Sequence, residues 1–577
     1  MPLFGKKIRI TFLFIFLAEL FSIFGYLLPD FNNFAFLIII FLALILSLIN
    51  LEYGIWIIFA ELFIGSKGYL FAFEQDGFLI SIRIALWLVI MAVWLGKIIS
   101  NWINSPVGEK KLQIKFFKSS YFYYFIILFL FIAWGIINGI LNHNGFSNIF
   151  FDFNGWLYFT LAFPVYSVFK KSTTNYFGIQ KNNSAIHAKS EIQSKRAKPW
   201  IPAFAGMTGA ARLTSPINTI LQIFTACILW LSFKTLFLLF AFSHNITSIT
   251  SELYRWTRVT GVGEITQMQG GFYRIFFQSH IFVLIGLFVF ILLLTQIVNQ
   301  KDKYNKKNIS YYLLLITLFL SIILISFSRS FWVGLIAGLL FYYFTPHLSS
   351  SFVIDKNFSN KKYSNILKKG AGFIILLFYK TSWKKLFQIS GTLLICAIMS
   401  IGLIIAIVKF PYPNPTGGFS TAELLSERAG QISGEAGVSS RWALLPELWD
   451  EIKQSPILGQ GFGATVTYKS SDPRVLESSP TGEYTTYAFE WGWLDIWLKL
   501  GLLGLISYLA LLTKIIFDGI FRNKAKDKII YGLTIGLIVI SAVSIFSPYM
   551  NHPLGIGYLI LCAAIINTYG AEEKRIV

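Results

Sequence analysis

Apolar residues run along this chain in long stretches, and polar residues gather in the segments between them. A helix needs roughly 20 mostly apolar residues to cross the hydrocarbon core of a membrane, because every buried backbone group must be bonded inside its own segment. The pattern therefore predicts an all-α, polytopic membrane protein with about 14 transmembrane helices (12 to 14). The expected spans are about 9–28, 33–50, 53–70, 78–97, 119–140, 148–169, 216–242, 275–297, 309–327, 330–346, 389–408, 498–517, 529–547 and 555–571.

Composition and charge agree with a membrane as the solvent. Only 13% of the 577 residues are charged and 55% are hydrophobic, whereas soluble domains carry roughly 25% charged residues. The net charge of +21 alone would also suggest a nucleic-acid binder. With a cytoplasmic N-terminus, however, the expected cytoplasmic segments hold 35 of the 49 lysines and arginines. The positive-inside rule thus explains the charge, and we expect both termini in the cytoplasm and no nucleic-acid partner.

The spans divide the chain into five parts. These are an N-terminal transmembrane bundle (1–169), a cytoplasmic loop (170–215), a second bundle (216–408), a large helical extracytoplasmic loop (409–497) and C-terminal transmembrane helices (498–577). The first apolar run is expected to stay as a signal anchor, and the three cysteines, all within spans, are expected to be packing residues.

Two segments expected in the cytoplasm differ in amino-acid composition from the rest of the chain. WIPAFAGMTG, inside 183–214, resembles peptides translated from palindromic repeats inserted into bacterial genes, so we hypothesise an insertion without catalytic role. The Lys-rich segment 347–388 is either a helix lying in the membrane interface or a solvated linker.

The outer loop 409–497 has its own elements. PYPNPTGG cannot continue a helix, and SSRWALLPELWDEIKQSP predicts a helix that Ser439 or Ser440 caps and that ends before Pro456. GQGFGATVTY is expected to be a flexible turn. TTYAFEWGWLDIWLKLGLLGL then predicts an aromatic helix that runs into the twelfth span. A loop of this length is usually functional.

Two arginines on the outer side could bind phosphate. Arg329 falls in the short connection between the ninth and tenth spans, with Ser328 and Ser330 as further donors. Arg441 falls at the first turn of the loop helix, where unpaired amides also favour an anion. The guanidinium fork suits phosphate oxygens because it binds them bidentately and keeps its charge. The alternatives are an arginine that reaches the headgroups and an ordinary surface arginine.

Further polar residues lie near the outer interface. Arg274, Gln278 and His280 are either phosphate or sugar contacts or interface anchors. Glu490 is expected on an aromatic helix face, where lost hydration would make it a better general base, or else paired with a loop cation.

No metal-ligand motif is present, so we expect no metal and no cofactor. The remaining charges in or near spans are expected to be paired or to reach the interface, unless the protein is a transporter; they are Glu19, Glu61, Arg83, Asp152 and Lys234.

Three motifs together resemble the O-antigen ligase and polymerase family of membrane glycosyltransferases over roughly 270–520. They are the Ser-Arg-Ser hairpin LLITLFLSIILISFSRSFWVGLIAGLL, the segment SSRWALLPELWDEIKQSPILGQGFG with its Pro-x-x-Gly-x-Gly loop, and EWGWLDIWLKLGLLGL. The resemblance implies that Arg329 and Arg441 bind the substrate diphosphate. It also places Glu490 where the family has its catalytic histidine, and no histidine occurs anywhere in 348–551.

The resemblance implies an inverting, metal-independent transfer of a glycan from a polyprenyl-diphosphate carrier, such as undecaprenyl diphosphate, to an acceptor hydroxyl. The acceptor would be a lipid A core or a growing polysaccharide, and the enzyme would work in lipopolysaccharide and cell-envelope biosynthesis. The site would face the periplasm from the bacterial inner membrane. A repeat-unit polymerase of the same family, a secondary transporter or lipid flippase, and an inactive structural homologue remain as alternatives.

Overall fold

The computed structural model describes residues 5–75, 78–105, 114–169, 216–299, 306–354, 383–418, 436–521 and 527–570. The longer helices are α1 (Lys6–Leu27), α2 (Pro29–Ile49), α3 (Leu51–Ile64), α4 (Ile82–Ile103), α5 (Phe122–Leu141), α9 (Pro216–Ser243), α10 (Thr247–Val259), α11 (His280–Asn299), α12 (Lys306–Ser326), α13 (Arg329–Ile354), α16 (Trp383–Val408), α18 (Ala436–Gln454), α20 (Gly492–Phe521), α21 (Lys528–Val543) and α22 (Pro553–Gly570). The short ones are η1 (Lys115–Lys118), α6 (Phe146–Phe153), η2 (Asn154–Leu161), α7 (Ala162–Val168), η4 (Gln269–Gly271) and α19 (Pro473–Ser478).

Most predicted spans are helices. Within the described residues, nine helices are long and apolar enough to cross a membrane, and α13, α21 and α22 contribute shorter apolar helices. The other two predicted spans differ in form. The third is the 14-residue α3, and the sixth is broken into α6, η2 and α7, with Gly155 and Pro164 interrupting it. A mostly helical membrane protein is thus confirmed, and the count of 14 crossings stays a prediction.

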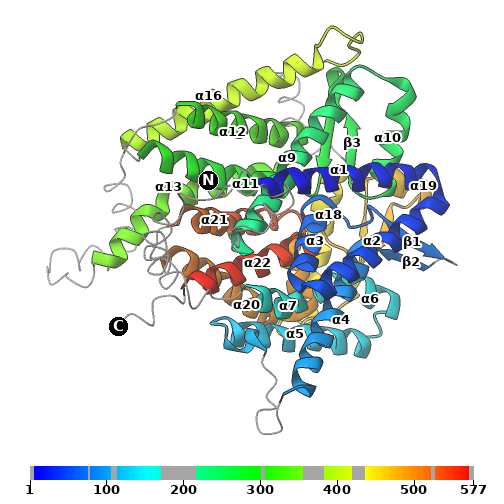
Figure 1. The fold of residues 1–577 in the computed structure, drawn as a ribbon. Coiled ribbons are helices and arrows are strands. Elements are labelled where there is room, and N and C mark those ends of the chain that lie inside the picture. Colours follow the sequence, from blue (N-terminus) through cyan, green and yellow to red (C-terminus); the bar gives the residue numbers. More distant parts are fainter. Residues whose placement is uncertain are drawn as a thin grey trace, which may run out of the picture.

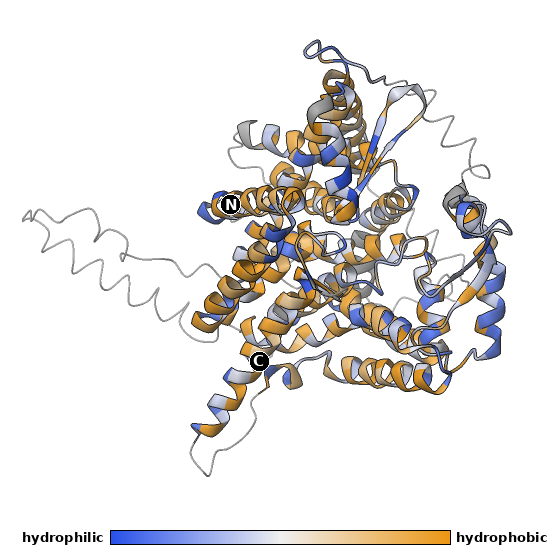
Figure 2. Cartoon of the chain, turned by 90° about the vertical axis from the view of Figure 1, so that its right-hand side faces the viewer, coloured by the Kyte–Doolittle hydropathy of each residue, from blue (hydrophilic) through white to orange (hydrophobic). Residues whose placement is uncertain are grey.

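Burial separates central from peripheral helices. In α11, 83% of the apolar window is buried, against 22% in α1, α2 and α16. α11 packs against α12 and α21, and α9 packs against α1, α3 and α11. The peripheral helices keep large apolar side chains such as Phe14 on the surface, and Figure 2 shows apolar residues along most helices. This is the distribution expected when lipid rather than water covers the outside.

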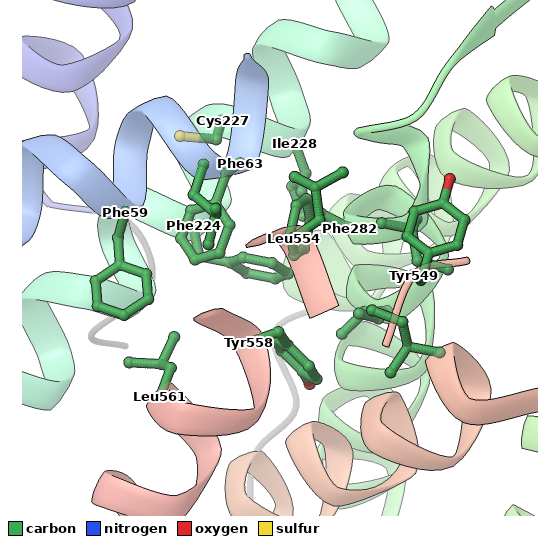
Figure 3. Close-up of a cluster of buried hydrophobic side chains, with 14 of the residues drawn as sticks. Phe59, Phe63, Phe224, Cys227, Ile228, Phe282, Tyr549, Leu554, Tyr558 and Leu561 are labelled. Atoms are coloured by element: carbon green, nitrogen blue, oxygen red, sulfur yellow. The ribbon is translucent and has the colours of Figure 1, made fainter. Parts of the chain in front are cut away.

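Aromatic side chains hold the centre together. Phe63 of α3 lies edge-on to Phe224 of α9 and to Phe282 of α11, with ring centroids 5.2 and 4.8 Å apart. Figure 3 shows this cluster continuing to Tyr549 and to Tyr558 of α22. Edge-to-face pairs of buried rings add to the gain from burial alone. The cluster therefore fixes α3, α9, α11 and α22 relative to one another.

Charged residues inside the helical body are paired, which is one of the two arrangements that the sequence left open. Arg83 donates to both carboxylate oxygens of Glu61, at 2.9 and 3.0 Å, and Lys234 lies 2.5 Å from Glu19. Asp152 pairs with Lys499, described below. The three cysteines are buried and free, in agreement with a packing role.

The all-α prediction missed three short antiparallel hairpins. They are β1 (Ala72–Gln75) with β2 (Phe78–Ser81), β3 (Gly263–Gln267) with β4 (Tyr273–Phe277), and β5 (Val466–Lys469) with β6 (Glu483–Thr486). Each strand has only four or five residues, so hydropathy averaged over a span-length window hides it. In Figure 1, β1, β2, β3, α10 and α19 lie on the right, away from the C-terminal end. All of them except β2, which begins the fourth predicted span, come from segments that the charge pattern assigns to the outer side.

Some predictions fall outside the described residues. The proposed insertion at 183–214 does, and so does most of the Lys-rich segment 347–388.

Removing Arg83 should destabilise the protein strongly. Its side chain is 3% exposed, so Arg83→Met leaves the Glu61 carboxylate buried without a partner. We expect a loss of about 3–5 kcal/mol of unfolding free energy. Arg255→Met is the matched control: Arg255 pairs with Glu252 but is 67% exposed, and its loss should cost no more than about 1 kcal/mol. Denaturant unfolding of the detergent-solubilised protein measures both, and equal losses would contradict the prediction.

Candidate active site

The structure brings two of the predicted residues together. Arg441 of α18 and Glu490, just before α20, form an ion pair through the Arg441 Nε and a Glu490 carboxylate oxygen. Trp491 fixes this contact, because its indole N–H donates to the Arg441 backbone oxygen at 3.0 Å. The side chains are 42% and 47% exposed, while the two contacting atoms themselves are buried, so a ligand can reach the other atoms of both groups.

The structure corrects the local setting of both residues. α18 begins at Ala436, so Arg441 lies in its second turn and Ser439 and Ser440 lie inside the helix instead of capping it. Ser440 instead shares a hydrogen bond of 2.8 Å with Ser470. Glu490 precedes the helix that starts at Gly492, and it is half-exposed rather than desolvated. Pairing with a loop cation, the alternative that the sequence left open for Glu490, is what the structure contains.

The Gly-rich loop after α18 is firmly held, not flexible as predicted. The Gln460 amide donates to the Leu498 carbonyl at 2.7 Å, and the Phe462 amide donates to the Gly135 carbonyl at 2.9 Å. Asn138 of α5 donates to the Gly459 carbonyl at 2.7 Å. Hydrogen bonds to both neighbouring helices therefore fix a loop whose composition alone suggested mobility.

Glycine is required where this loop crosses α5. Gly461 has a φ of +85°, a conformation that side chains disfavour, and a Cβ there would lie 2.1 Å from the Gly139 amide nitrogen. The glycines of the Pro-x-x-Gly-x-Gly motif thus allow two backbones to touch.

A buried lysine at the start of α20 joins the parts of the site. The Lys499 ammonium lies 2.6 Å from Asp152 of α6 and 2.5 Å from Asp495, and it donates to Tyr487 O at 3.0 Å. Its side chain is 1% exposed, and these three acceptors use its three N–H groups. Asp152 also accepts the Gly463 amide at 2.9 Å, while Asp495 accepts from the Asn551 side chain. One ammonium therefore ties the Gly-rich loop to the segment that carries Glu490.

Arg329 lies where the sequence placed it, at the turn between α12 and α13. It is the first residue of α13, and it is partly buried. Its neighbours Ser328 and Ser330 are both 7% exposed and are 3.1 Å apart through their hydroxyls, and Ser547 donates to Ser330 at 3.1 Å. The serines thus stabilise the turn, and their predicted role as phosphate donors gains no support.

The third group of predicted residues separates in space. Arg274 of β4 donates to Ser326 O at 2.9 Å, which ties it to the end of α12 beside the Arg329 turn. Gln278 lines a cavity considered below. His280 is fully buried, and both ring nitrogens are used: Nδ1 accepts from the Phe277 amide and Nε2 donates to Thr235. His280 has no face for a substrate, which removes it from the predicted sugar contacts.

Sequence reasoning missed the loop between α21 and α22. Within residues 544–552, Phe546 packs on Trp491, Ser547 reaches Ser330, and the Tyr549 hydroxyl donates to Gln278 O at 2.9 Å. A single segment thus touches the surroundings of Glu490, of Arg329 and of Gln278. The signal was the polar cluster SPYMNH between two apolar runs.

This loop also ends in a histidine that carries no charge at neutral pH. Burial, together with the positive charges of Arg83 and Lys67, lowers the pKa of His552 to about 3. The Leu554 amide faces its Nδ1 at 3.5 Å.

The arrangement places positive charge where an anion could bind. Cations lie at Arg441 and Arg329, and a half-exposed carboxylate lies beside Arg441. Within the described residues, no cluster of three or more histidine, cysteine, aspartate or glutamate side chains could hold a metal ion.

Gly461→Ala should disrupt the loop, since the new methyl group must displace the α5 backbone. We expect several kcal/mol lower stability, or misplacement of 459–463 with loss of activity, measured by unfolding and by protease sensitivity. Gly96→Ala is the control. A Cβ there meets nothing within 4 Å, and in a helix interior it should stabilise by about 0.5–1 kcal/mol. Similar behaviour of the two variants would refute the close-approach argument.

Comparison with known families bears on this site. No curated protein and no solved structure matches the chain. Residues 367–509 match the family model described as O-Antigen ligase. The match contains Arg441, the Gly-rich loop and Glu490, while Arg329 lies before it, so it covers less than the 270–520 of the predicted resemblance. This segment of the chain is therefore similar to the O-antigen ligase family.

Proposed function

We propose that this protein transfers a glycan from a polyprenyl-diphosphate carrier to an acceptor hydroxyl at the outer face of the bacterial inner membrane. The observation that carries the proposal is the Arg441–Glu490 contact. Two residues from separate motifs meet, half-exposed, inside the segment that matches the O-antigen ligase family. Similarity to that family supports lipid-linked glycans and polysaccharide acceptors as partners in general.

The proposed step is a direct displacement. The acceptor oxygen attacks the anomeric carbon as its proton passes to the Glu490 carboxylate. The bond between the anomeric carbon and the diphosphate oxygen breaks, and the diphosphate leaves with the bonding electrons, so the anomeric configuration inverts. Charge grows on the leaving oxygens, where Arg441 and Arg329 supply positive charge.

The Arg441–Glu490 ion pair suggests that donor binding comes before proton transfer. In the absence of substrate, Arg441 contacts the Glu490 carboxylate. An arriving diphosphate competes for the same guanidinium fork, since phosphate and carboxylate oxygens are alternative bidentate partners. Binding of the donor would then release Glu490 to accept a proton from the acceptor.

Lys499 acts through position rather than contact with substrate. It binds the Tyr487 carbonyl and lies 5.3 Å from the centre of the Phe489 ring, and both residues precede Glu490. The packed Gly-rich loop on its other side makes this support rigid. A base fixed by buried partners keeps the geometry that proton transfer needs.

A ligase and a repeat-unit polymerase would use the same parts. Loss of a ligase leaves long chains on the carrier, whereas loss of a polymerase leaves single repeats. The structure gives less reason to propose a secondary transporter or flippase. The intramembrane charges that such a protein would use as a relay are paired, Glu19 with Lys234 and Glu61 with Arg83.

Arg441→Ala should lower the transfer rate by about 10²–10³-fold, because the leaving diphosphate loses a cation. An exposed pair contributes at most about 1 kcal/mol, so the protein should remain folded in the membrane. The rate is measured with purified protein and a polyprenyl-diphosphate glycan. Lys453→Ala, on the same helix and 60% exposed, should keep full activity. Unchanged transfer by Arg441→Ala would refute the role of this arginine.

Glu490→Gln should lower transfer by about 10²–10⁴-fold and remove the acid limb of the pH–rate profile, since the amide cannot accept the proton. Glu447→Gln, an exposed position on α18, is the matched control. A slower variant that keeps the acid limb would show that Glu490 only orients Arg441, and the base role would then be rejected.

A further inference from the structure

A cavity of about 100 Å³ lies apart from the Arg441–Glu490 pair, between the segment after α3 and the β3–β4 hairpin. Its lining residues are Lys67, Arg258, Gly261, Gly263, Glu264, Phe276 and Gln278. They come from the outer ends of the third and eighth predicted spans and from the segment before the eighth, on the side that the charge pattern assigns as outer. Figure 1 shows α10, which carries Arg258, next to β3 at the edge of the molecule.

The charged groups of this cavity do not neutralise one another. Within the described part of the chain, the Lys67 ammonium and the Glu264 carboxylate take part in no ion pair or hydrogen bond, although both line the same space. Arg258 donates through one N–H to the Tyr254 hydroxyl at 2.9 Å and stacks on that ring. This contact orients the guanidinium and leaves its other N–H groups for a ligand. Two cations face one carboxylate, so the cavity favours an anion.

An amide in the wall also lacks its partner. The Gln278 side-chain oxygen is buried and accepts no hydrogen bond from the described residues, while the Gln278 backbone oxygen is used by Tyr549. A buried carbonyl without a donor is unfavourable, and buried polar groups in native proteins usually have a partner from the protein, a water or a ligand. A hydroxyl group in the cavity would satisfy it.

Glycines keep the opposite wall thin. The Lys67 amide faces the Gly261 carbonyl at 3.4 Å, and a Cβ on Gly261, whose φ is +61°, would meet the Lys67 side chain at 3.0 Å. The ligand can therefore approach backbone directly on this side.

We propose that this cavity binds a sugar phosphate. Lys67 and Arg258 bind the phosphate oxygens, while Glu264 and Gln278 accept hydrogen bonds from sugar hydroxyls. Phe276 packs against the carbon face of the ring, as aromatic side chains pack on apolar surfaces. A bare anion would need no carboxylate in the wall, and a neutral sugar would need no cations. Binding of a sugar phosphate in this cavity does not depend on the proposed function. The assignment of that sugar phosphate to the donor or to the acceptor does rest on the proposed function.

The bound sugar phosphate could come from either of two substrates, and an experiment can distinguish them. Loop 544–552 joins this cavity to the catalytic region, since Tyr549 contacts Gln278 and Ser547 contacts the Arg329 turn. The phosphate could thus belong to the donor whose glycan is transferred, or to a phosphorylated sugar of the acceptor.

Binding to the purified full-length protein tests the cavity without any turnover. The probe is N-acetylglucosamine 1-phosphate, with inorganic phosphate and N-acetylglucosamine as comparators. We expect Lys67→Gln and Arg258→Gln each to raise the Kd of the probe about tenfold, the loss of one charged contact. Arg255→Gln, on the same helix but outside the cavity, should leave it unchanged. An unchanged Kd in both cavity variants overturns the site, and equal affinity for inorganic phosphate overturns the sugar.

Steady-state kinetics then assign the source. If the phosphate is the donor's, Lys67→Gln raises the KM for the donor alone; if it is the acceptor's, the variant raises the KM for the acceptor alone. Either result supports the cavity, and normal values for both overturn its role in transfer. A wild-type protein that binds the probe through Lys67 but transfers no glycan would overturn the proposed function and leave the cavity standing.

Discussion

Lys499 is the constraint on which the candidate site depends. Its ammonium is almost fully buried between Asp152 and Asp495 and has a third acceptor in Tyr487 O. Taking three charges out of water is expensive, and the cost is offset only if every donor and acceptor is matched in a fixed geometry. Removing Lys499 would leave two buried carboxylates without their cation. The cluster therefore permits one arrangement of α6, α20 and the chain before α20, and it excludes sliding between them.

The remaining parts of the site follow from this fixed point. Asp152 receives the amide of Gly463, which locks the Gly-rich loop against α5, while Lys499 holds the chain just before Glu490. Trp491 then connects that chain to Arg441. The Arg441 and Glu490 side chains remain half-exposed, as the proposed binding of a charged substrate requires. The result is a rigid support beneath two accessible groups, the usual design of a preorganised site.

Sequence patterns predicted a good part of the fold and less of the site. The apolar stretches located most of the helices. The cost of isolated charge in an apolar environment predicted that Glu19, Glu61 and Asp152 would be paired or reach the interface, without naming their partners. Helix starts were less well determined. Arg441 was expected in a first turn and Glu490 on a helix face, and both shifted because packing against other segments decides where a helix begins. The GQGFG loop was expected to be flexible, since its composition does not reveal that it crosses α5.

The sequence by itself determined that the chain belongs in a membrane and where its helices run, and it supplied the motifs of the O-antigen ligase family, because hydropathy and short-range spacing are local properties. Only the tertiary structure decided which charges meet. The Arg441–Glu490 contact, the Lys499 cluster and the cavity between Lys67 and Arg258 all join residues from different segments. So does the role of loop 544–552, which carries no motif of its own and acts through contacts with three other regions. Such contacts depend on how helices pack, and packing is set by the shapes of many side chains at once.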